Sequence, residues 1–139
     1  MERVLLDTDI FSELLKQKHK KVLETAKSYH HFFGCYTIST VTILEIVKGF
    51  HKIQREDSIQ RLLSMLKNIE LVTLTAASAE IAGRMYADLE CGDQTIGRAD
   101  PIIAAIAVER NLVLCTGNEK HYSRIQQLGY PLLLTNWKM

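Results

Sequence analysis

Cysteine is scarce in this chain of 139 residues, and its three copies are isolated from one another. An odd count without any CxxC spacing supports neither a disulfide framework nor a zinc site. Cys35 and Cys115 lie in apolar runs, so we expect both to be small buried residues. These features favour a protein of the reducing cytosol.

Long apolar runs are also missing, since stretches such as 102–108 are far shorter than the roughly 20 residues that span a bilayer. The first residues lack the charged start, long apolar middle and cleavage site of a signal peptide. We therefore expect a soluble, cytoplasmic protein with no membrane contact.

Neither sign of charge dominates, because 17 Lys and Arg oppose 16 Asp and Glu for a net charge of +1. A polyanion would therefore need a local basic patch. The lysine-rich run 16–21 is a candidate, although a solvated helix end explains it equally well.

Apolar residues, at 47% of the chain, are sufficient for a core, and we expect one domain over residues 1–139. Apolar, β-rich runs alternate with helical spacing, which predicts a three-layer α/β/α sandwich around a mainly parallel sheet of about five strands. Strands are expected at 4–6, 35–38, 71–74, 112–115 and 132–134. Helices are expected at about 10–15, 22–31, 41–50, 59–66, 76–89, 100–108 and 118–128.

Polar side chains stand where functional groups gather in parallel α/β proteins, at the carboxyl ends of the strands. Two acids follow the first strand, and another lies in the first turns of the helix after the second strand. A fourth opens the helix at 100–108, after the polar, glycine-bounded loop 92–97, and two further polar residues follow the strand 112–115. In chain order these candidates are Asp7, Asp9, Glu45, Asp100, Asn118 and Glu119.

Carboxylates that cluster repel one another unless a cation neutralises them, and oxygen ligands suit hard ions such as Mg²⁺ or Mn²⁺. Such a site can activate water and stabilise the charge that develops during phosphodiester hydrolysis. The chain has no histidine-rich metal motif, P-loop or nucleophile elbow that would indicate another chemistry.

Helix capping is the structural alternative for each acid. Asp7 or Asp9 could cap the first helix, and capping accounts well for Asp100 because Pro101 follows it. Glu45 and Thr42 have the spacing of a capping box, but the apolar residues before them favour an earlier helix start.

Taken together, these segments resemble the PIN-domain ribonucleases, and most closely the VapC-like toxins of bacterial and archaeal toxin–antitoxin pairs. The order and spacing of the motifs agree along nearly the whole chain. The matching segments are LLDTDI at 5–10, STVTILEIVKG at 39–49, IGRADPIIAAIA at 96–107, LVLCTGNEKHY at 112–122 and NW at 136–137.

The resemblance implies that Asp7, Glu45 and Asp100 bind the divalent metal. At the fourth position the family often carries an aspartate two residues after the threonine. Here Asn118 stands there, and an acid comes only at Glu119. Supporting roles are implied for Asp9, Ser12 and Thr116.

The family also implies a homodimer, a cognate antitoxin that covers the active site, and RNA, often transfer RNA, as the substrate. Two alternatives stay open. A phosphatase of the haloacid dehalogenase type would use the DxD of Asp7 and Asp9 and the GD of Gly92 and Asp93, although the chain is short for that family. A binding module that has lost catalysis would explain Asn118.

Overall fold

The computed structural model describes residues 1–94 and 98–139, so the predicted loop 92–97 lies partly outside the described residues. The strands are β1 (Val4–Leu6), β2 (Thr37–Ser39), β3 (Glu70–Val72), β4 (Val113–Cys115) and β5 (Leu134–Thr135). They form one sheet in the order β3-β2-β1-β4-β5, and all neighbouring strands are parallel. The predicted parallel sheet of five strands is therefore confirmed.

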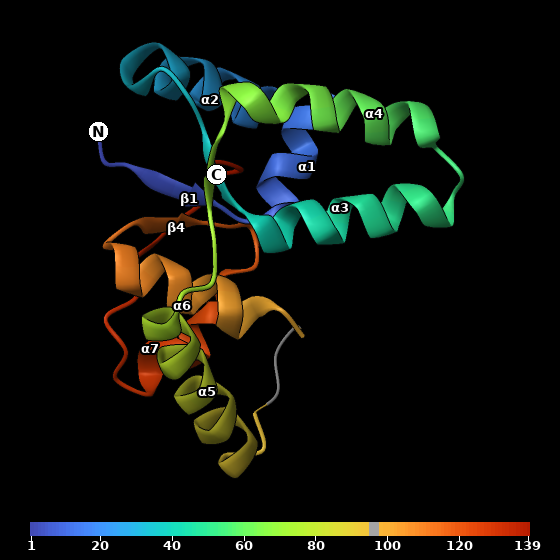
Figure 1. The fold of residues 1–139 in the computed structure, drawn as a ribbon. Coiled ribbons are helices and arrows are strands. Elements are labelled where there is room, and N and C mark those ends of the chain that lie inside the picture. Colours follow the sequence, from blue (N-terminus) through green and yellow to red (C-terminus); the bar gives the residue numbers. More distant parts are fainter. Residues whose placement is uncertain (95–97) are drawn as a thin grey trace.

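Helices cover both faces of this sheet, which makes a three-layer sandwich (Figure 1). One face carries α1 (Thr8–Lys16), α2 (Lys20–Phe33), α3 (Thr40–Lys52) and α4 (Glu56–Met65), which is followed by the short helix η1 (Leu66–Asn68). The other face carries α5 (Ala76–Cys91), α6 (Asp100–Arg110) and α7 (Glu119–Gln127). None of the helices in the described ranges is long and apolar enough to cross a lipid bilayer.

The alternation of side chains along the central strands divides the core into two layers. Leu5 and Leu114 pack against α5, α6 and α7, whereas Val4, Leu6 and Cys115 pack against the helices of the opposite face. Both faces of a covered parallel strand must be apolar, which explains the short unbroken apolar runs in the sequence. Polar groups are therefore displaced to the strand ends, where Asp7 follows β1.

The first strand lies where it was predicted, and the other strand positions differ from the sequence predictions by one or two residues. β2 begins at Thr37 rather than at Cys35, and Cys35 is only half-buried, so its predicted burial is wrong. Cys115 is fully buried as predicted, and burial raises the pKa of its thiol to about 12. β5 lies at Leu134–Thr135, later than the predicted strand.

Polar side chains cap the beginnings of the first three helices. The Asp7 carboxylate accepts a hydrogen bond from the Thr8 amide and caps α1, so of the two acids considered the cap is Asp7 and not Asp9. Ser39 caps α3 through the Thr42 amide, and His19 caps α2. The lysine-rich run 16–21 therefore spans the end of α1 and the start of α2.

Candidate active site

Asp7 is the most buried of the candidate acids, with 3% of its surface exposed at the carboxyl end of β1. Its amide donates to the Cys115 carbonyl at 2.9 Å, which fixes the backbone between β1 and β4. Its Oδ1 accepts from the Thr8 amide at 2.8 Å, and its Oδ2 accepts from the Thr116 hydroxyl at 2.9 Å. The carboxylate orientation is therefore fixed from both sides.

Burial, which is the largest cause, together with the negative charges of Asp9 and Asp100 raises the pKa of Asp7 from 3.8 to about 7. The hydrogen bonds from Thr116 and Thr8 lower this pKa but do not offset the burial. A buried carboxyl beside two other acids is costly to ionise, and a bound cation would remove that cost.

Asp100 is the first residue of α6, and it makes no side-chain capping bond. The capping explanation for Asp100 is therefore wrong. Its carboxylate instead contacts α7, where the Tyr122 hydroxyl donates to Oδ1 at 3.1 Å and His121 Nδ1 lies 3.3 Å from Oδ2. Just before α6 begins, the Arg98 carbonyl accepts a hydrogen bond from the Tyr86 hydroxyl of α5.

Glu45 lies in the second turn of α3, which begins at Thr40, so it is not part of a capping box. The Thr8 hydroxyl donates to Glu45 Oε1 at 2.6 Å and lies 3.0 Å from the Thr42 hydroxyl. The backbone amide of Thr8 also donates to Asp7, so Thr8 connects the carboxylates of Asp7 and Glu45.

Asp9 lies in the first turn of α1 and faces the loop after β4. Its Oδ2 accepts from the Gly117 amide at 2.9 Å and lies 3.6 Å from Lys138 Nζ. A Cβ at Gly117 would stand 2.6 Å from Asp9 Oδ2, so only glycine permits this approach. Asp9 Oδ1 is buried and has no hydrogen-bond partner among the described residues.

The residues of the fourth position lie at the start of α7. Asn118 is exposed and makes no side-chain capping bond, whereas its amide donates to the Thr116 hydroxyl at 3.0 Å. Asn118 thus supports Asp7 indirectly, because Thr116 in turn binds that carboxylate. Glu119 follows, half-buried, in the first turn of α7.

The structure thus brings four candidate acids to one edge of the sheet, although it does not group them into a finished metal site. Over residues 1–94 and 98–139, no three acidic, histidine or cysteine side chains lie close enough to hold an ion. Two observations nevertheless fit a cation: the unpartnered Asp9 Oδ1 and the raised pKa of Asp7.

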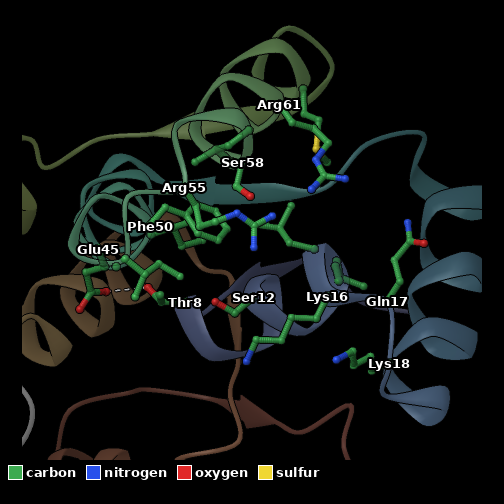
Figure 2. Close-up of a pocket in the computed structure, with 17 residues that line it drawn as sticks. Thr8, Ser12, Lys16, Gln17, Lys18, Glu45, Phe50, Arg55, Ser58 and Arg61 are labelled. Atoms are coloured by element: carbon green, nitrogen blue, oxygen red, sulfur yellow. Dashed lines mark hydrogen bonds between the residues drawn. The ribbon is translucent and has the colours of Figure 1, made fainter.

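A groove with a volume of about 690 Å³ opens beside this acidic edge, between α1, α3 and α4. Figure 2 shows Thr8 and Glu45 at one end of it, joined by their hydrogen bond, with Ser12 further along α1. Ser12 therefore lines the groove and is not a hydrogen-bond partner of the acids.

The lining of this groove combines an apolar surface with basic side chains. The basic ones are Lys16 and Lys18 from the lysine-rich run, and Arg55 and Arg61 from α4 and the turn before it. Arg55 pairs with Asp57 at 3.2 Å. The apolar lining includes Leu14, Ile46, Phe50, Ile53, Leu62 and Met65.

Sequence reasoning missed Thr8, Gly117, Tyr122, His121 and Lys138 as partners of the acids. The first four lie inside the motifs that carry the family resemblance, so their position pointed to the site, but nothing in the sequence indicated which hydroxyl or amide would meet which carboxylate.

Comparisons with known proteins identify the family to which this chain belongs. The PIN domain family model matches residues 4–127. The chain is 29% identical over 126 residues to the tRNA(fMet)-specific endonuclease VapC of Shigella flexneri, which covers 90% of this chain and 93% of that protein. It is 30% identical over 101 residues to Ribonuclease VapC2 of Rickettsia felis, with 72% of each chain covered.

Among solved structures, VapBC-1 from nontypeable Haemophilus influenzae superposes with a TM-score of 0.79 and 25% identity, covering 98% of both chains. The family model spans most of the chain and includes all four candidate acids. Asp7 lies at the end of β1, Asp9 in α1, Glu45 in α3 and Asp100 at the start of α6. The chain therefore belongs to the PIN domain family, and its relatives include VapC ribonucleases.

Proposed function

We propose that this protein is a cytoplasmic endoribonuclease that depends on Mg²⁺ or Mn²⁺, and that residues 1–139 form its single nuclease domain. It is the toxin of a toxin–antitoxin pair and inhibits translation by cutting RNA. The observation that carries this proposal is the buried Asp7, whose pKa is raised to about 7 by burial and by neighbouring acids, in a fold shared with VapC ribonucleases.

In this proposal Asp7, Glu45 and Asp100 hold the divalent ion, and Asp9 adds negative charge beside them. When bound there, the ion would supply Lewis-acid activation of water and stabilisation of the charge that develops on the leaving oxygen of the phosphodiester. Thr116 and Thr8 orient the Asp7 carboxylate, and Thr8 also holds Glu45.

The exposed side-chain amide of Asn118 occupies the fourth position, where it can position water or an RNA phosphate from the rim of the site. Glu119 adds a further acid in the next position of α7. An amide has no charge with which to hold a second ion tightly, so we expect one strongly bound metal.

The test is RNA cleavage by the purified protein with Mg²⁺, with Mn²⁺ and with a chelator. Asp100→Asn should lower the rate at least 100-fold, because an amide oxygen is a much weaker ligand than a carboxylate. Asp93→Asn is the matched control, since Asp93 is an exposed aspartate in the turn after α5. Cleavage without metal, or equal cleavage by both variants, would contradict the mechanism.

The substrate class we propose is transfer RNA, because the Shigella flexneri relative is named as a tRNA(fMet)-specific endonuclease. Incubation with total tRNA and with an unstructured RNA of similar length would separate the two substrates. Faster cleavage of the unstructured RNA would reject the tRNA assignment and keep the ribonuclease assignment.

Of the two other functions, the haloacid dehalogenase-type phosphatase is not supported, since the family match is to the PIN domain. The non-catalytic binding module predicts that RNA binds but is never cut. The comparison of wild type with Asp100→Asn decides this, because a binding module would show the same absence of cleavage in both.

The partner we propose is a small antitoxin that binds in the groove between α1, α3 and α4. The related solved structure contains a VapB antitoxin with its VapC. An apolar groove with basic side chains fits an amphipathic segment that carries apolar and acidic residues. Such a segment would end beside Glu45 and Thr8 and so cover the acids.

Arg61→Glu should therefore weaken antitoxin binding and relieve inhibition, while RNA cleavage in the absence of antitoxin continues. Arg84→Glu is the matched control, because Arg84 lies on α5 on the opposite face of the sheet and pairs there with Glu80. Equal inhibition of both variants would place the antitoxin elsewhere.

We also propose that the protein forms a homodimer, which light scattering of the purified protein would test.

A further inference from the structure

Each of the three acids assigned to the metal accepts at least one hydrogen bond from a protein hydroxyl. Thr116 donates to Asp7, and Thr8 donates to Glu45. Both threonines lie in loops or first turns directly beside a strand end. The third hydroxyl belongs to Tyr122, which lies on α7 and donates to Asp100 Oδ1 at 3.1 Å.

Tyr122 is fully buried, and its ring packs in the core layer formed by α5, α6 and α7. Burial and the negative charges of Asp7 and Asp100 raise its pKa well above its usual value. The hydroxyl therefore stays protonated and lies near both carboxylates. A buried ring in a packed core has little freedom to rotate, so the position of this donor is fixed.

The two oxygens of Asp100 have partners of different kinds. Oδ1 contacts the buried Tyr122 hydroxyl, whereas Oδ2 lies 3.3 Å from His121, whose side chain is 47% exposed. An exposed imidazole can turn away into solvent at little cost, whereas the tyrosine cannot. Oδ2 is therefore the oxygen that becomes available for a ligand.

We propose that Tyr122 is a positioning residue that orients Asp100 for the divalent ion by holding Oδ1 and leaving Oδ2 free. This inference rests on the proposed metal-dependent function. Hydrogen-bond partners of metal ligands commonly change metal affinity by about 10- to 100-fold when they are removed.

The test is direct Mn²⁺ binding without RNA, measured from the electron paramagnetic resonance signal of free Mn²⁺. Tyr122→Phe should weaken binding about 10-fold, since the ring is kept and only the hydroxyl is lost. Tyr130→Phe is the matched control, because Tyr130 donates to the carboxylate of Asp88, outside the acidic edge, and its removal should leave binding unchanged. Unchanged or tighter binding by folded Tyr122→Phe would overturn the proposal.

A kinetic measurement separates positioning from a general loss of structure. In Tyr122→Phe the Mg²⁺ concentration for half-maximal cleavage should rise about 10-fold, while the rate at saturating Mg²⁺ and the KM for RNA stay within about twofold. A fall in the saturated rate with an unchanged Mg²⁺ requirement would contradict positioning of a metal ligand.

If Tyr122→Phe does not fold, wild-type protein with ¹³C-labelled tyrosine provides the test. Addition of Mg²⁺ should shift the Tyr122 signal and leave the Tyr130 signal unmoved, and an unmoved Tyr122 signal would overturn the inference.

The proposed metal-dependent function and the proposed role of Tyr122 fail in different ways. Wild type that binds no Mn²⁺ would overturn both, whereas normal wild-type binding with no effect of Tyr122→Phe would overturn only the role of Tyr122.

Discussion

Asp7 is a carboxyl group whose burial and acidic neighbours make ionisation costly in the folded protein. Its pKa of about 7 lies above the value of 3.8 for an exposed aspartate. Between these two pH values the folded state binds more protons than the unfolded state. The free energy of unfolding should therefore decrease as the pH rises from about 4 to about 7, at up to about 1.4 kcal/mol per pH unit for this group.

Asp7→Asn removes this ionisation, so without metal the variant should be more stable than wild type at pH 8 by about 1–3 kcal/mol. At pH 4 the difference should nearly vanish, because wild-type Asp7 is then protonated. Urea unfolding followed by circular dichroism at both pH values measures this, with the exposed Asp93→Asn as control. An equal difference at the two pH values would refute the raised pKa.

Gly117→Ala should disturb Asp9, because the new Cβ would stand 2.6 Å from Asp9 Oδ2 and 3.2 Å from Lys138 Nζ. The carboxylate must shift and lose its hydrogen bond from the Gly117 amide, so we expect a loss of about 1–2 kcal/mol in stability and slower cleavage. Gly83→Ala on α5 is the control, since open space surrounds it, and a helical alanine there should stabilise slightly. Equal stability of the two variants would argue against the close contact.

Helices α1 and α3 are joined at the site by the first residue of α1. The Thr8 hydroxyl forms hydrogen bonds with Glu45 and Thr42 of α3. The backbone amide of Thr8 donates to the carboxylate of Asp7, which caps α1. The beginnings of two helices on one face of the sheet are therefore held together by one side chain. This contact holds the Glu45 carboxylate beside the residue that follows Asp7.

Thr8→Val keeps the shape of the side chain but removes the hydroxyl. Glu45 then loses its donor and its fixed orientation, so the Mg²⁺ concentration for half-maximal cleavage should rise about 10-fold, and stability should fall by about 1 kcal/mol. Thr25→Val on α2 is the control, because its hydroxyl bonds only to a carbonyl of its own helix. The same metal requirement in both variants would show that Glu45 acts without Thr8.

At the scale of the whole molecule, a net charge of +1 conceals an uneven distribution of charge. Acids gather at one edge of the sheet, and basic side chains line the groove that begins there. A cation bound by the acids would stabilise the folded state only, since the unfolded chain does not bring these residues together.

Mg²⁺ at 10 times its dissociation constant should add about 1.4 kcal/mol to the stability, which corresponds to a rise in Tm of about 5 °C. Thermal melts of wild type and Asp100→Asn with and without Mg²⁺ would measure this effect, and the variant should show little rise. An equal rise in both proteins would mean that Mg²⁺ acts elsewhere on the surface.

Much of the fold could be predicted from the sequence, because strands covered on both faces must be apolar and helices must be amphipathic. These patterns located five strands and the main helices to within a few residues. Strand ends were less certain, as Cys35 shows, since a small apolar residue can stand either inside a short strand or just before it.

The candidate site was predictable as a set of acids at strand ends, but the role of each acid was not. From the sequence, capping was the strongest alternative for Asp100 and was also open for Asp7 and Asp9. The structure gives the capping bond to Asp7 and directs Asp100 to α7. Local sequence shows which groups could cap a helix, and only packing decides whether a different partner lies closer.

The sequence by itself determined the alternation of strands and helices, and with it the sheet edge to which Asp7, Glu45 and Asp100 are brought. Only the tertiary structure decided that the Tyr122 hydroxyl meets Asp100, that Gly117 lies against Asp9, and that a groove opens beside Glu45. The physical reason is distance along the chain. Local patterns of burial determine helices and strands, whereas contacts between residues more than 100 positions apart, such as Asp9 and Gly117, depend on how all the layers pack.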